Sequence, residues 1–565
     1  MDKRWNILAA DTATVQTLQD SLKIHPILCE LLVQRGIDSF DAAKKFFRPQ
    51  LEHLHDPWLM KDMGKAVDRI EKAVVNKESI LVFGDYDVDG TTSVATLYQF
   101  LKKLTEQVDY YIPHRYKEGY GVSKIGIDYA KQTGIQLIIS VDCGIKSIEL
   151  VEYAKELGID FIICDHHLPD AILPPAIAIL NPKQIDCNYP FKELCGCGVV
   201  LKLITALADK YKLPAESYLE YLDLVATAIA ADIVPIVDEN RTLAYFGLQQ
   251  VNESPCPGLL ALMELAKQTT PMRITNLVFA VAPRINAAGR MKHGNHAVTL
   301  LTEIDFNLAA EHALDIDQYN TDRRETDKRI TEEALVQIEE NSEQERFSTV
   351  VYDENWHKGV IGIVASRLIE TYYRPTLVFT KSGNKLAASA RSVKGFDVYN
   401  ALEACSEFIE QFGGHKYAAG LTLLPENYEA FKTKFESFVK ESIDPKLLTP
   451  ELKIDSEINL NEIDHRLYRI LSQFAPFGPG NMTPVFMTQA IKDTGWGKCV
   501  GEDDKHLRFT ATQKANEKLV CIGFGLGDKL DIIKDKKSFN VVYTIDENRW
   551  NGNISLQLKL KDIKA

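Results

Sequence analysis

The 565-residue sequence has no apolar run long enough to span a bilayer, and its N-terminus lacks the apolar core of a secretory signal. It also lacks an excess of positive charge, because 65 Lys and Arg residues against 79 Asp and Glu residues give a formal net charge of −14. This balance argues mildly against a general nucleic-acid-binding protein, although basic residues can still be concentrated locally. We therefore expect a cytoplasmic protein with no membrane segment.

Cysteine is sparse, with 10 residues, and several lie inside apolar runs, which fits buried reduced thiols better than disulfides. Cys187, Cys195 and Cys197 lie close in sequence, but their spacing matches no usual zinc pattern, so we interpret them as structural. The apolar and charged fractions, 45% and 25%, are those of an ordinary globular protein. A chain of this length is expected to divide into about three or four domains.

One stretch organises the sequence. The apolar run Ile80–Phe83, stopped by Gly84, predicts a buried strand, and Asp85, Asp87 and Asp89 follow it directly. Clustered carboxylates cannot all stay ionised unless a cation compensates them. Oxygen ligands of this kind suit Mg²⁺ or Mn²⁺, so the stretch predicts a metal site.

Two alternatives compete with a metal site of this type. The pattern Asp-x-Asp-x-Asp-Gly also opens the Ca²⁺ loop of an EF-hand. That interpretation fails because Thr96 stands where the loop needs a bidentate Glu, and a strand rather than a helix precedes the loop. A solvated acidic turn stays open on this stretch alone.

Further apolar segments end in the same way. The run 136–141 ends at Asp142, the run 160–164 ends in Asp165-His166-His167, and an apolar segment with helical character ends just before Asp232. Parallel strands joined by crossover helices bring their carboxyl ends to one edge of the sheet, where ligands bind. The predicted constellation is Asp85, Asp87, Asp89, Asp142, His166, His167 and Asp232.

These motifs resemble those of the DHH phosphoesterase superfamily, through Asp165-His166-His167, the loop Asp85–Gly90 and Asp142. Three further segments resemble the DHH-associated domain: His357–Arg367, Ala388–Ser392 and Phe412–His415. Two C-terminal segments resemble the RecJ family of single-stranded-DNA exonucleases: Phe477–Asn481 and Asn548–Gly552. The resemblance covers nearly the whole chain, with no departure in the metal set.

The strand patterns and the resemblance together predict an α/β protein. A DHH parallel-sheet domain and a DHH-associated α/β domain are joined by a long helix and followed by an OB-fold β-barrel. The helix is predicted from a charged segment with apolar residues at loosely helical spacing, and the barrel from short, regularly spaced strands. The expected boundaries are 1–78 for a helical lead-in, 79–303, 304–345 for the connecting helix, 346–445 and 451–565.

Phosphodiester hydrolysis by two divalent ions needs a bridging carboxylate and further ligands on each ion. We assign Asp142 as the bridge, Asp85 and Asp87 to one ion, and Asp89, His166 and Asp232 to the other. The place of Asp85 assumes that the segment stays extended, so that alternate side chains share one face. His167 is assigned as a contact to the scissile phosphate or a proton donor, and the catalytic set is His167, Asp142 and Asp87. The mixed ligands favour Mn²⁺ over Mg²⁺ in affinity.

Several residues are candidates for contacts with nucleic acid. Arg115 would neutralise a phosphate, Tyr120 would stack on a base, and Arg284 and Arg290 would contact the backbone. Hydroxyl, guanidinium and backbone N–H groups suit capture of a phosphate, and the resemblance implies a 5′-phosphate pocket formed by Ser389, Arg391, Gly414 and His415.

The predicted barrel carries a second set of candidates. Cationic and aromatic side chains can combine phosphate neutralisation with base stacking. The candidates are Lys498, Lys505, His506, Arg508, Arg549 and Trp550. An ordinary solvated barrel surface is an equal alternative.

The resemblance implies a processive, metal-dependent exonuclease that degrades single-stranded DNA from the 5′ end to 5′-mononucleotides, in recombination and repair. It implies single-strand-binding protein and a RecQ-type helicase as partners, and we expect a monomer. A DHH phosphodiesterase acting on short oligonucleotides or cyclic dinucleotides is the alternative, although such enzymes generally lack the C-terminal barrel. A non-catalytic DNA-binding scaffold is a third hypothesis, against which the intact metal set argues.

Overall fold

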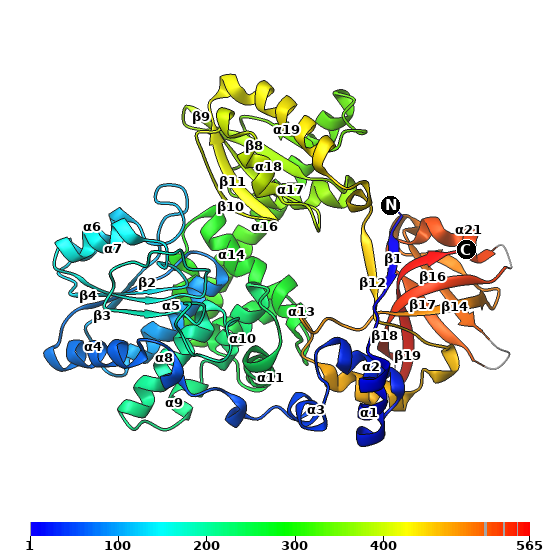
Figure 1. Ribbon diagram of the computed structural model, residues 1–565, viewed down its shortest axis with the longest axis horizontal. Helices are drawn as coiled ribbons and strands as arrows, with labels where there is room; N and C mark the ends of the chain where they lie inside the picture. Colours follow the sequence, from blue (N-terminus) through cyan, green and yellow to red (C-terminus); the bar gives the residue numbers. More distant parts are fainter. Residues whose placement is uncertain (1, 514–516, 535–536, 551) are drawn as a thin grey trace.

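The computed structural model describes residues 2–513, 517–534, 537–550 and 552–565. Figure 1 shows three lobes at the corners of a triangle. We call them the first lobe (residues 63–303), the second lobe (346–445) and the barrel lobe (4–47 with 451–565). Among the described residues, no helix combines the length and the apolar character needed to cross a bilayer.

The first lobe is built on an all-parallel sheet of five strands in the order β3-β2-β4-β5-β6. The strands are β2 (Ile80–Phe83), β3 (Val108–Tyr111), β4 (Leu137–Val141), β5 (Asp160–Cys164) and β6 (Ala178–Leu180). Every residue of β2 and β4 is buried, as expected for parallel strands covered on both faces. The chain places β3 on one side of β2 and β4 on the other, so the strand order reverses there, where α/β sheets form their ligand crevice.

Helices cover both faces of this sheet. On one face α6 (Lys124–Gln132) and α7 (Ile148–Glu156) pack on β2, β4 and β5. The other face carries the larger core, formed with α4 (Met63–Asn76), α5 (Val88–Lys102), α8 (Gly196–Lys210) and α10 (Leu222–Ala231). The repeated strand, loop and helix pattern predicted from the sequence is confirmed.

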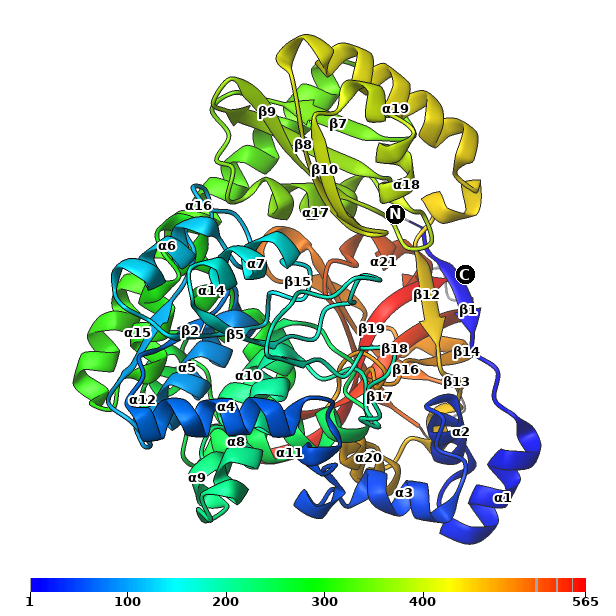
Figure 2. The ribbon, with the colours of Figure 1, turned by 60° about the vertical axis from the view of Figure 1, so that its left-hand side comes forward.

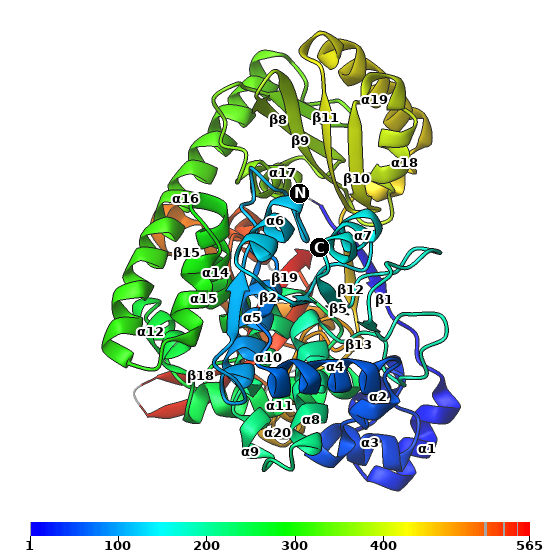
Figure 3. The same ribbon diagram turned by 90° about the vertical axis from the view of Figure 1, so that its left-hand side faces the viewer.

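The first and second lobes are joined by α16 (Phe306–Glu340), a helix of 35 residues that runs along one side of the molecule in Figure 3. Its N-terminal half buries Ala309, Ala313 and Ile316 in the first-lobe core. Its C-terminal half buries Ile330, Ala334 and Ile338 against the second lobe. The predicted connecting helix is confirmed, and its apolar residues divide between two cores.

The second lobe contains a mixed sheet in the order β10-β11-β9-β8-β7, in which only β7 and β8 pair in parallel. The strands are β7 (Thr349–Tyr352), β8 (Thr376–Ser382), β9 (Lys385–Arg391), β10 (Gln411–His415) and β11 (Ala418–Leu423). One face packs on α17 (Ile361–Thr371) together with α16, and the other on α18 (Val398–Glu403) and α19 (Tyr428–Ser442).

Among the described residues, the main sheet of the barrel lobe has seven strands in the order β13-β14-β18-β19-β17-β16-β15, and a further pairing of β14 with β16 closes it. They are β13 (Ser456–Glu457), β14 (Phe486–Asp493), β15 (Lys498–Val500), β16 (His506–Thr512), β17 (Leu519–Gly523), β18 (Phe539–Trp550) and β19 (Asn553–Lys564). The predicted C-terminal barrel is therefore confirmed.

The N-terminal segment also belongs to the barrel lobe. In Figure 2, β1 (Arg4–Ile7) lies beside β12 (Glu451–Ile454), with which it pairs in parallel. Helices α1 (Thr12–Leu22), α2 (Pro26–Gln34) and α3 (Phe40–Phe47) add buried residues to the barrel-lobe core. From the sequence we predicted that residues 1–78 form a helical lead-in to the first strand. The sequence could not show that part of this segment packs on the barrel, because an apolar helix face does not reveal which element covers it. We propose that residues 4–47 be counted with the barrel lobe.

Candidate metal centre and nucleic-acid interface

The acidic loop lies between β2 and α5. Asp87 is the N-cap of α5, and its Oδ1 accepts a hydrogen bond from the Gly90 N–H at 2.9 Å. Gly90 is required because a Cβ there would lie 2.6 Å from the carbonyl oxygen of Asp85. Asp89 is already in the first turn of α5 and accepts two N–H groups from the start of α8, at 2.6 and 2.8 Å. The expectation that the loop stays extended is therefore wrong at Asp89, because the helix begins at Val88.

Four predicted ligands converge beyond the ends of the strands. His166 Nε2 lies 3.1 Å from Asp142 Oδ1, 3.7 Å from Asp89 Oδ2 and 3.6 Å from Asp232 Oδ2. Asp142 follows β4 in the left-handed conformation (φ 58°), and Asp232 caps the C-terminus of α10. The donor atoms form two groups within 4.8 Å, Asp89 with His166 and Asp232, and Asp142 with His166 and His167.

The donor atoms of this cluster fit a divalent cation. Within the described part of the chain, Asp85 Oδ2, Asp142 Oδ1 and both ring nitrogens of His166 are buried without a hydrogen-bond partner. Buried polar atoms are normally paired, and unpaired ones call for an ion or another unseen partner. Carboxylate oxygens mixed with imidazole nitrogen suit Mn²⁺ and Mg²⁺.

The electrostatics of the cluster lead to the same conclusion. Burial, and then the charge of Asp87, raises the pKa of Asp89 to about 7. Burial and the charges of Asp89 and Asp87 raise the pKa of Asp232 to about 8. Burial, followed by the charge of His167, lowers the pKa of His166 to about 3, so its imidazole is neutral and free to bind a cation. The carboxyl groups of this cluster can therefore all be ionised together only when a positive charge lies among them.

Asp85 stands apart from both donor groups. Its Oδ1 accepts a hydrogen bond from the Gly121 N–H at 3.2 Å. Burial and the charge of Asp87 raise its pKa well above the usual value. Asp87 also raises the pKa of Asp89 and Asp142, so it is the electrostatic link between Asp85 and the rest of the cluster.

His167 is held in a fixed orientation at the edge of the cluster. Its Nδ1 lies 2.7 Å from Asp165 Oδ1, and its Nε2 lies 3.3 Å from the Tyr120 hydroxyl. Burial lowers the pKa of His167, but the hydrogen bond to Asp165 and the charge of Asp165 outweigh burial and raise this pKa to about 9. The ring is therefore protonated at neutral pH, with Nε2 available as a donor.

Asp165 has a function that sequence reasoning did not assign. One carboxylate oxygen accepts the backbone N–H groups of His166 (2.7 Å) and His167 (3.1 Å), and the other accepts that of Ile145 (2.9 Å). Burial raises the pKa of Asp165, but the hydrogen bond to His167, the charges of His167 and His166 and the Ile145 N–H bring it to about 2. The signal was present in the sequence, because an Asp directly before two histidines can accept their N–H groups.

A basic cluster lies between the first and second lobes. It consists of three of the predicted DNA-contacting arginines, Arg115, Arg290 and Arg391. Burial, followed by the charges of Arg115 and Arg391, lowers the pKa of Arg290 to about 10. Arg290 donates to the Gly359 carbonyl at 3.0 Å, and Arg115 lies 4.6 Å from the centre of the Tyr86 ring. Among the described residues none of the three arginines is in an ion pair, whereas other arginines nearby are. The cluster therefore fits an anion.

The second-lobe side of this cluster brings together Ser389 and Arg391, two of the four residues of the predicted phosphate pocket. Arg391 Nη1 donates to Ser389 Oγ at 3.0 Å. A Cβ at Gly362, near the start of α17, would lie 2.9 Å from both Arg391 Nη2 and Ser389 Oγ, so only glycine lets these groups approach the helix. The N-terminus of a helix adds partial positive charge beside the guanidinium group.

Other predicted contacts lie elsewhere. Arg284 pairs with Asp317 of α16 at 2.7 Å and donates to the Ala280 carbonyl, so it ties two helices together. Gly414 and His415 lie in β10, an exposed edge strand; His415 is in one row with Arg391 across β11, roughly 10 Å away. The side chain of Trp550 lies outside the described residues.

Family models match three segments of the chain. Residues 79–229 match the DHH family, N-terminal domain, residues 346–441 match the DHHA1 domain, and residues 454–562 match the RecJ OB domain. These segments correspond to the parallel sheet, the mixed sheet and the closed barrel.

Full-length relatives agree with this assignment. The single-stranded-DNA-specific exonuclease RecJ of Bacillus subtilis (strain 168) is 36% identical over 563 residues, which cover 99% of this chain and 70% of that protein. The chain belongs to the RecJ family. RecJ of Escherichia coli (strain K12) is 33% identical over 96% of both chains.

Solved RecJ structures have the same fold. RecJ from Thermus thermophilus in complex with Mn²⁺ has a TM-score of 0.85 at 27% identity and covers 100% of this chain and 79% of its own. The same protein in complex with Mg²⁺ has a TM-score of 0.79 at 26% identity, and covers 100% and 78%. The resemblance predicted from the motifs is confirmed at the level of family and fold.

Proposed function

We propose that this RecJ-family protein hydrolyses single-stranded DNA from the 5′ end, with two divalent ions, Mn²⁺ or Mg²⁺, and releases 5′-mononucleotides. The observation that carries the proposal is the convergence of Asp89, Asp142, His166 and Asp232 around buried atoms that lack hydrogen-bond partners. The names of relatives 36% and 33% identical to this chain support the substrate class.

Asp89, His166 and Asp232 would hold one ion. Asp142, the predicted bridge, lies against His166 and would hold the second ion as well. Asp85 and Asp87 complete the predicted set at the end of β2. Bound divalent ions would offset the negative charge of the scissile phosphate and make a water molecule more acidic.

We assign to His167 the contact with the substrate. Asp165 holds its Nδ1, which leaves the protonated Nε2 directed toward Tyr120 at the mouth of the site. A protonated imidazole there can donate a hydrogen bond to the scissile phosphate and a proton to the departing oxygen. Tyr120 is 50% exposed and offers a face on which a terminal base can stack.

The basic cluster supports the proposed polarity. Arg115 stacks on Tyr86, which lies between Asp85 and Asp87 in the sequence. The basic cluster is therefore next to the proposed metal ligands, which we call the metal cluster. A terminal 5′-phosphate bound by Ser389 and Arg391 would place the first phosphodiester bond toward the carboxylates. Cleavage at a fixed distance from the end releases one nucleotide at a time.

The barrel lobe argues against the alternative of an enzyme for short oligonucleotides or cyclic dinucleotides, because those substrates do not reach a third lobe. The complete donor cluster argues against a non-catalytic scaffold. A nuclease restricted to single strands needs duplexes to be opened and single strands kept accessible. We therefore propose a RecQ-type helicase and single-strand-binding protein as partners of a cytoplasmic monomer, in DNA recombination and repair.

The proposal is tested with two long single-stranded oligonucleotides in Mn²⁺, one labelled at the 5′ end and one at the 3′ end. We expect immediate release of labelled mononucleotide from the first and gradual shortening of the second. Turnover of di- to tetranucleotides alone, with long strands untouched, would overturn the proposal. A 5′-labelled duplex with blunt ends serves as the control that remains uncut.

A further inference from the structure

The segment Phe477–Asn481 forms a tight turn that we call the clamp turn. Two backbone hydrogen bonds close it, from Gly478 N to Asn481 O (3.0 Å) and from Asn481 N to Gly478 O (2.9 Å). The Asn481 side chain is 1% exposed, and its Nδ2 donates to the carbonyls of Phe474 (2.8 Å) and Pro476 (2.9 Å). The barrel lobe therefore holds the clamp turn rigidly from within.

The clamp turn docks on residues 233–237 of the first lobe, which we call the strap. The Ile236 N–H donates to the Pro479 carbonyl at 2.7 Å. A Cβ at Gly478 would overlap Ile236 Cδ1 and lie 3.0 Å from its Cγ1. A Cβ at Gly480 (φ 73°) would lie 2.9 Å from Val237 Cγ1. At both glycines a side chain of the strap would have to shift to admit a Cβ, because the two lobes approach closely there.

A second contact anchors the first lobe just beyond the strap. Arg241, in α11 (Asp238–Glu253), is 4% exposed and donates to five barrel-lobe carbonyls. The acceptors belong to Phe46, Gln473, Phe474, Ala475 and Pro476. The C-terminal end of the strap is therefore fixed to the barrel lobe by two neighbouring contacts.

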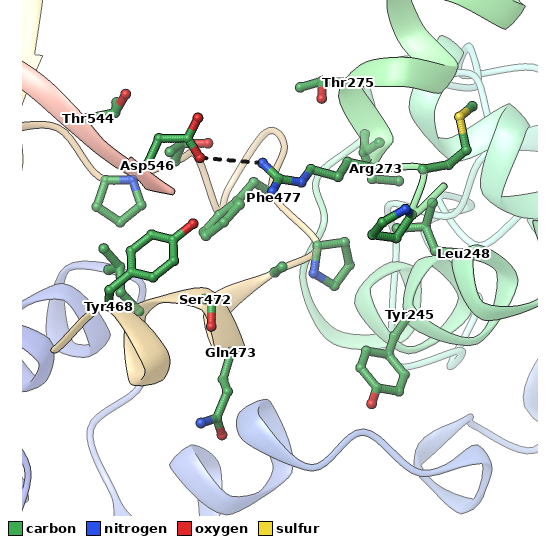
Figure 4. A pocket seen from close by; sticks show the side chains of 18 of the residues that line it. Tyr245, Leu248, Arg273, Thr275, Tyr468, Ser472, Gln473, Phe477, Thr544 and Asp546 are labelled. Carbon is green, nitrogen blue, oxygen red and sulfur yellow. Dashed lines mark ion pairs between the residues drawn. The ribbon is translucent and has the colours of Figure 1, made fainter. Parts of the chain in front are cut away.

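Beside these contacts, the first lobe and the barrel lobe are less closely packed against each other. Figure 4 shows a cavity of about 700 Å³ between α11 and the barrel strands, with Phe477 on one side and Leu248 on the other. The Arg273–Asp546 ion pair, at 3.9 Å, crosses it. Close packing between the two lobes is thus concentrated at the strap.

The strap begins directly after Asp232. The next residue, Ile233, is 67% exposed and has a φ of 61°, which is unfavourable for a β-branched side chain. Strained residues persist where the surrounding structure holds them in place. Here Asp232 N bonds the Ala228 carbonyl on one side, and the clamp turn holds Ile236 on the other.

We propose that the clamp turn is a positioning element of the metal centre: it fixes the strap and thereby holds the Asp232 carboxylate against Asp89 and His166. The proposal rests on the proposed metal centre. The barrel lobe then contributes to one ion site without supplying a ligand. Asp142 belongs to the donor group that lacks Asp232, so the ion that Asp142 holds is expected to be insensitive to the clamp turn.

The test is calorimetric titration of the full-length protein with Mn²⁺, together with kcat and KM on a single-stranded oligonucleotide. G478A should weaken one of two Mn²⁺ sites by about 10- to 100-fold, the range for lost supporting contacts, and lower kcat with little change in KM. I236A removes the atoms that the new methyl group would overlap and leaves Cβ 3.8 Å away. The double variant G478A/I236A should therefore bind Mn²⁺ more tightly than G478A alone.

A matched pair covers the case in which G478A does not fold. G480A introduces a smaller overlap at φ 73°, and G383A places the same change at φ 65° in the second lobe, with no atom within 4 Å of the Cβ. We expect weaker Mn²⁺ binding in G480A and unchanged binding in G383A. Equal Mn²⁺ affinities in G480A, G383A and wild type, or a double variant no better than G478A, overturn the positioning role.

The two proposals fail differently. A wild-type protein that binds two Mn²⁺ ions but leaves single strands intact overturns the proposed function, and the Mn²⁺ titrations still decide the role of the clamp turn. A wild-type protein that binds no Mn²⁺ overturns both.

Discussion

The metal cluster and the basic cluster are electrostatic opposites built side by side. In the metal cluster burial and like charges raise carboxyl pKa values, to about 7 for Asp89 and about 8 for Asp232. In the basic cluster burial and like charges lower the pKa of Arg290 to about 10. Within each cluster, like charges repel one another. A bound counter-charge would reduce this repulsion: a cation in the metal cluster and a phosphate in the basic cluster.

The two clusters differ in how they are assembled. The metal cluster comes from strand ends, the first turn of α5 and the C-terminus of α10, all within the first lobe. The basic cluster combines a first-lobe loop (Arg115), α14 (Ala282–Met291, with Arg290) and β9 of the second lobe (Arg391). Metal binding is therefore expected to depend on the first lobe and on the clamp turn of the barrel lobe, whereas phosphate binding depends on how the first and second lobes meet.

The largest effect is expected at the metal cluster. Asp142→Ala removes the predicted bridging carboxylate and should reduce hydrolysis by more than about 100-fold, beyond the usual loss for supporting contacts, while single-strand binding persists. Rates on a 5′-labelled strand and affinity by fluorescence anisotropy measure the two properties. Comparable activity in this variant would contradict the site assignment.

The basic cluster should give a smaller, selective effect. Arg391→Ala removes hydrogen bonds to a charged phosphate, each worth about 1.5–3 kcal/mol, or roughly 10- to 100-fold in affinity. The loss should appear with 5′-phosphorylated strands and be slight with 5′-hydroxyl strands. Arg284→Ala is the matched control, because Arg284 pairs with Asp317 and should affect stability without changing this preference. Equal losses on both strands would remove the distinction between the clusters.

The pH dependence of Mn²⁺ binding sharpens the comparison further. The folded carboxyl groups of Asp89 and Asp232 have raised pKa values, and a cation must displace their protons. Apparent affinity should therefore fall as pH drops below about 8, by up to about tenfold per pH unit for each proton displaced. Titrations at pH 6, 7 and 8 measure it. A pH-independent affinity would mean that these carboxylates do not hold the ion.

The smallest effect is expected outside both clusters. Lys498, opposite Arg508 in the barrel, is predicted to neutralise one DNA phosphate. Lys498→Ala should weaken single-strand binding a few-fold for all sequences and reduce the slope of log affinity against log salt by about 0.7. Lys328→Ala, an exposed lysine of α16 that pairs with Glu332, is the control. An unchanged slope would favour the ordinary solvated surface.

The proposed metal ligands could be predicted from the sequence because the rule that locates them uses only neighbouring residues. A buried apolar run followed by Asp or His marks the carboxyl end of a parallel strand, and such ends meet at one edge. Asp142 and His166 were predicted in this way, whereas Asp232 was predicted from the apolar helical segment that ends at it and α16 from its spacing of apolar residues. The extended path through Asp89 was wrong because Asp87 caps a helix there, a side-chain interaction that competes with extension.

The amino-acid sequence by itself determined the order of the lobes, the buried strands and the carboxylates and imidazoles that follow them, because these depend on patterns within a few residues. Tertiary structure alone decided that α1 to α3 cover the barrel, that Arg290 meets Arg391 while Arg284 pairs with Asp317, and that the clamp turn reaches the strap. Such contacts join segments far apart in the chain and depend on complementary shape, which no local pattern of residues records.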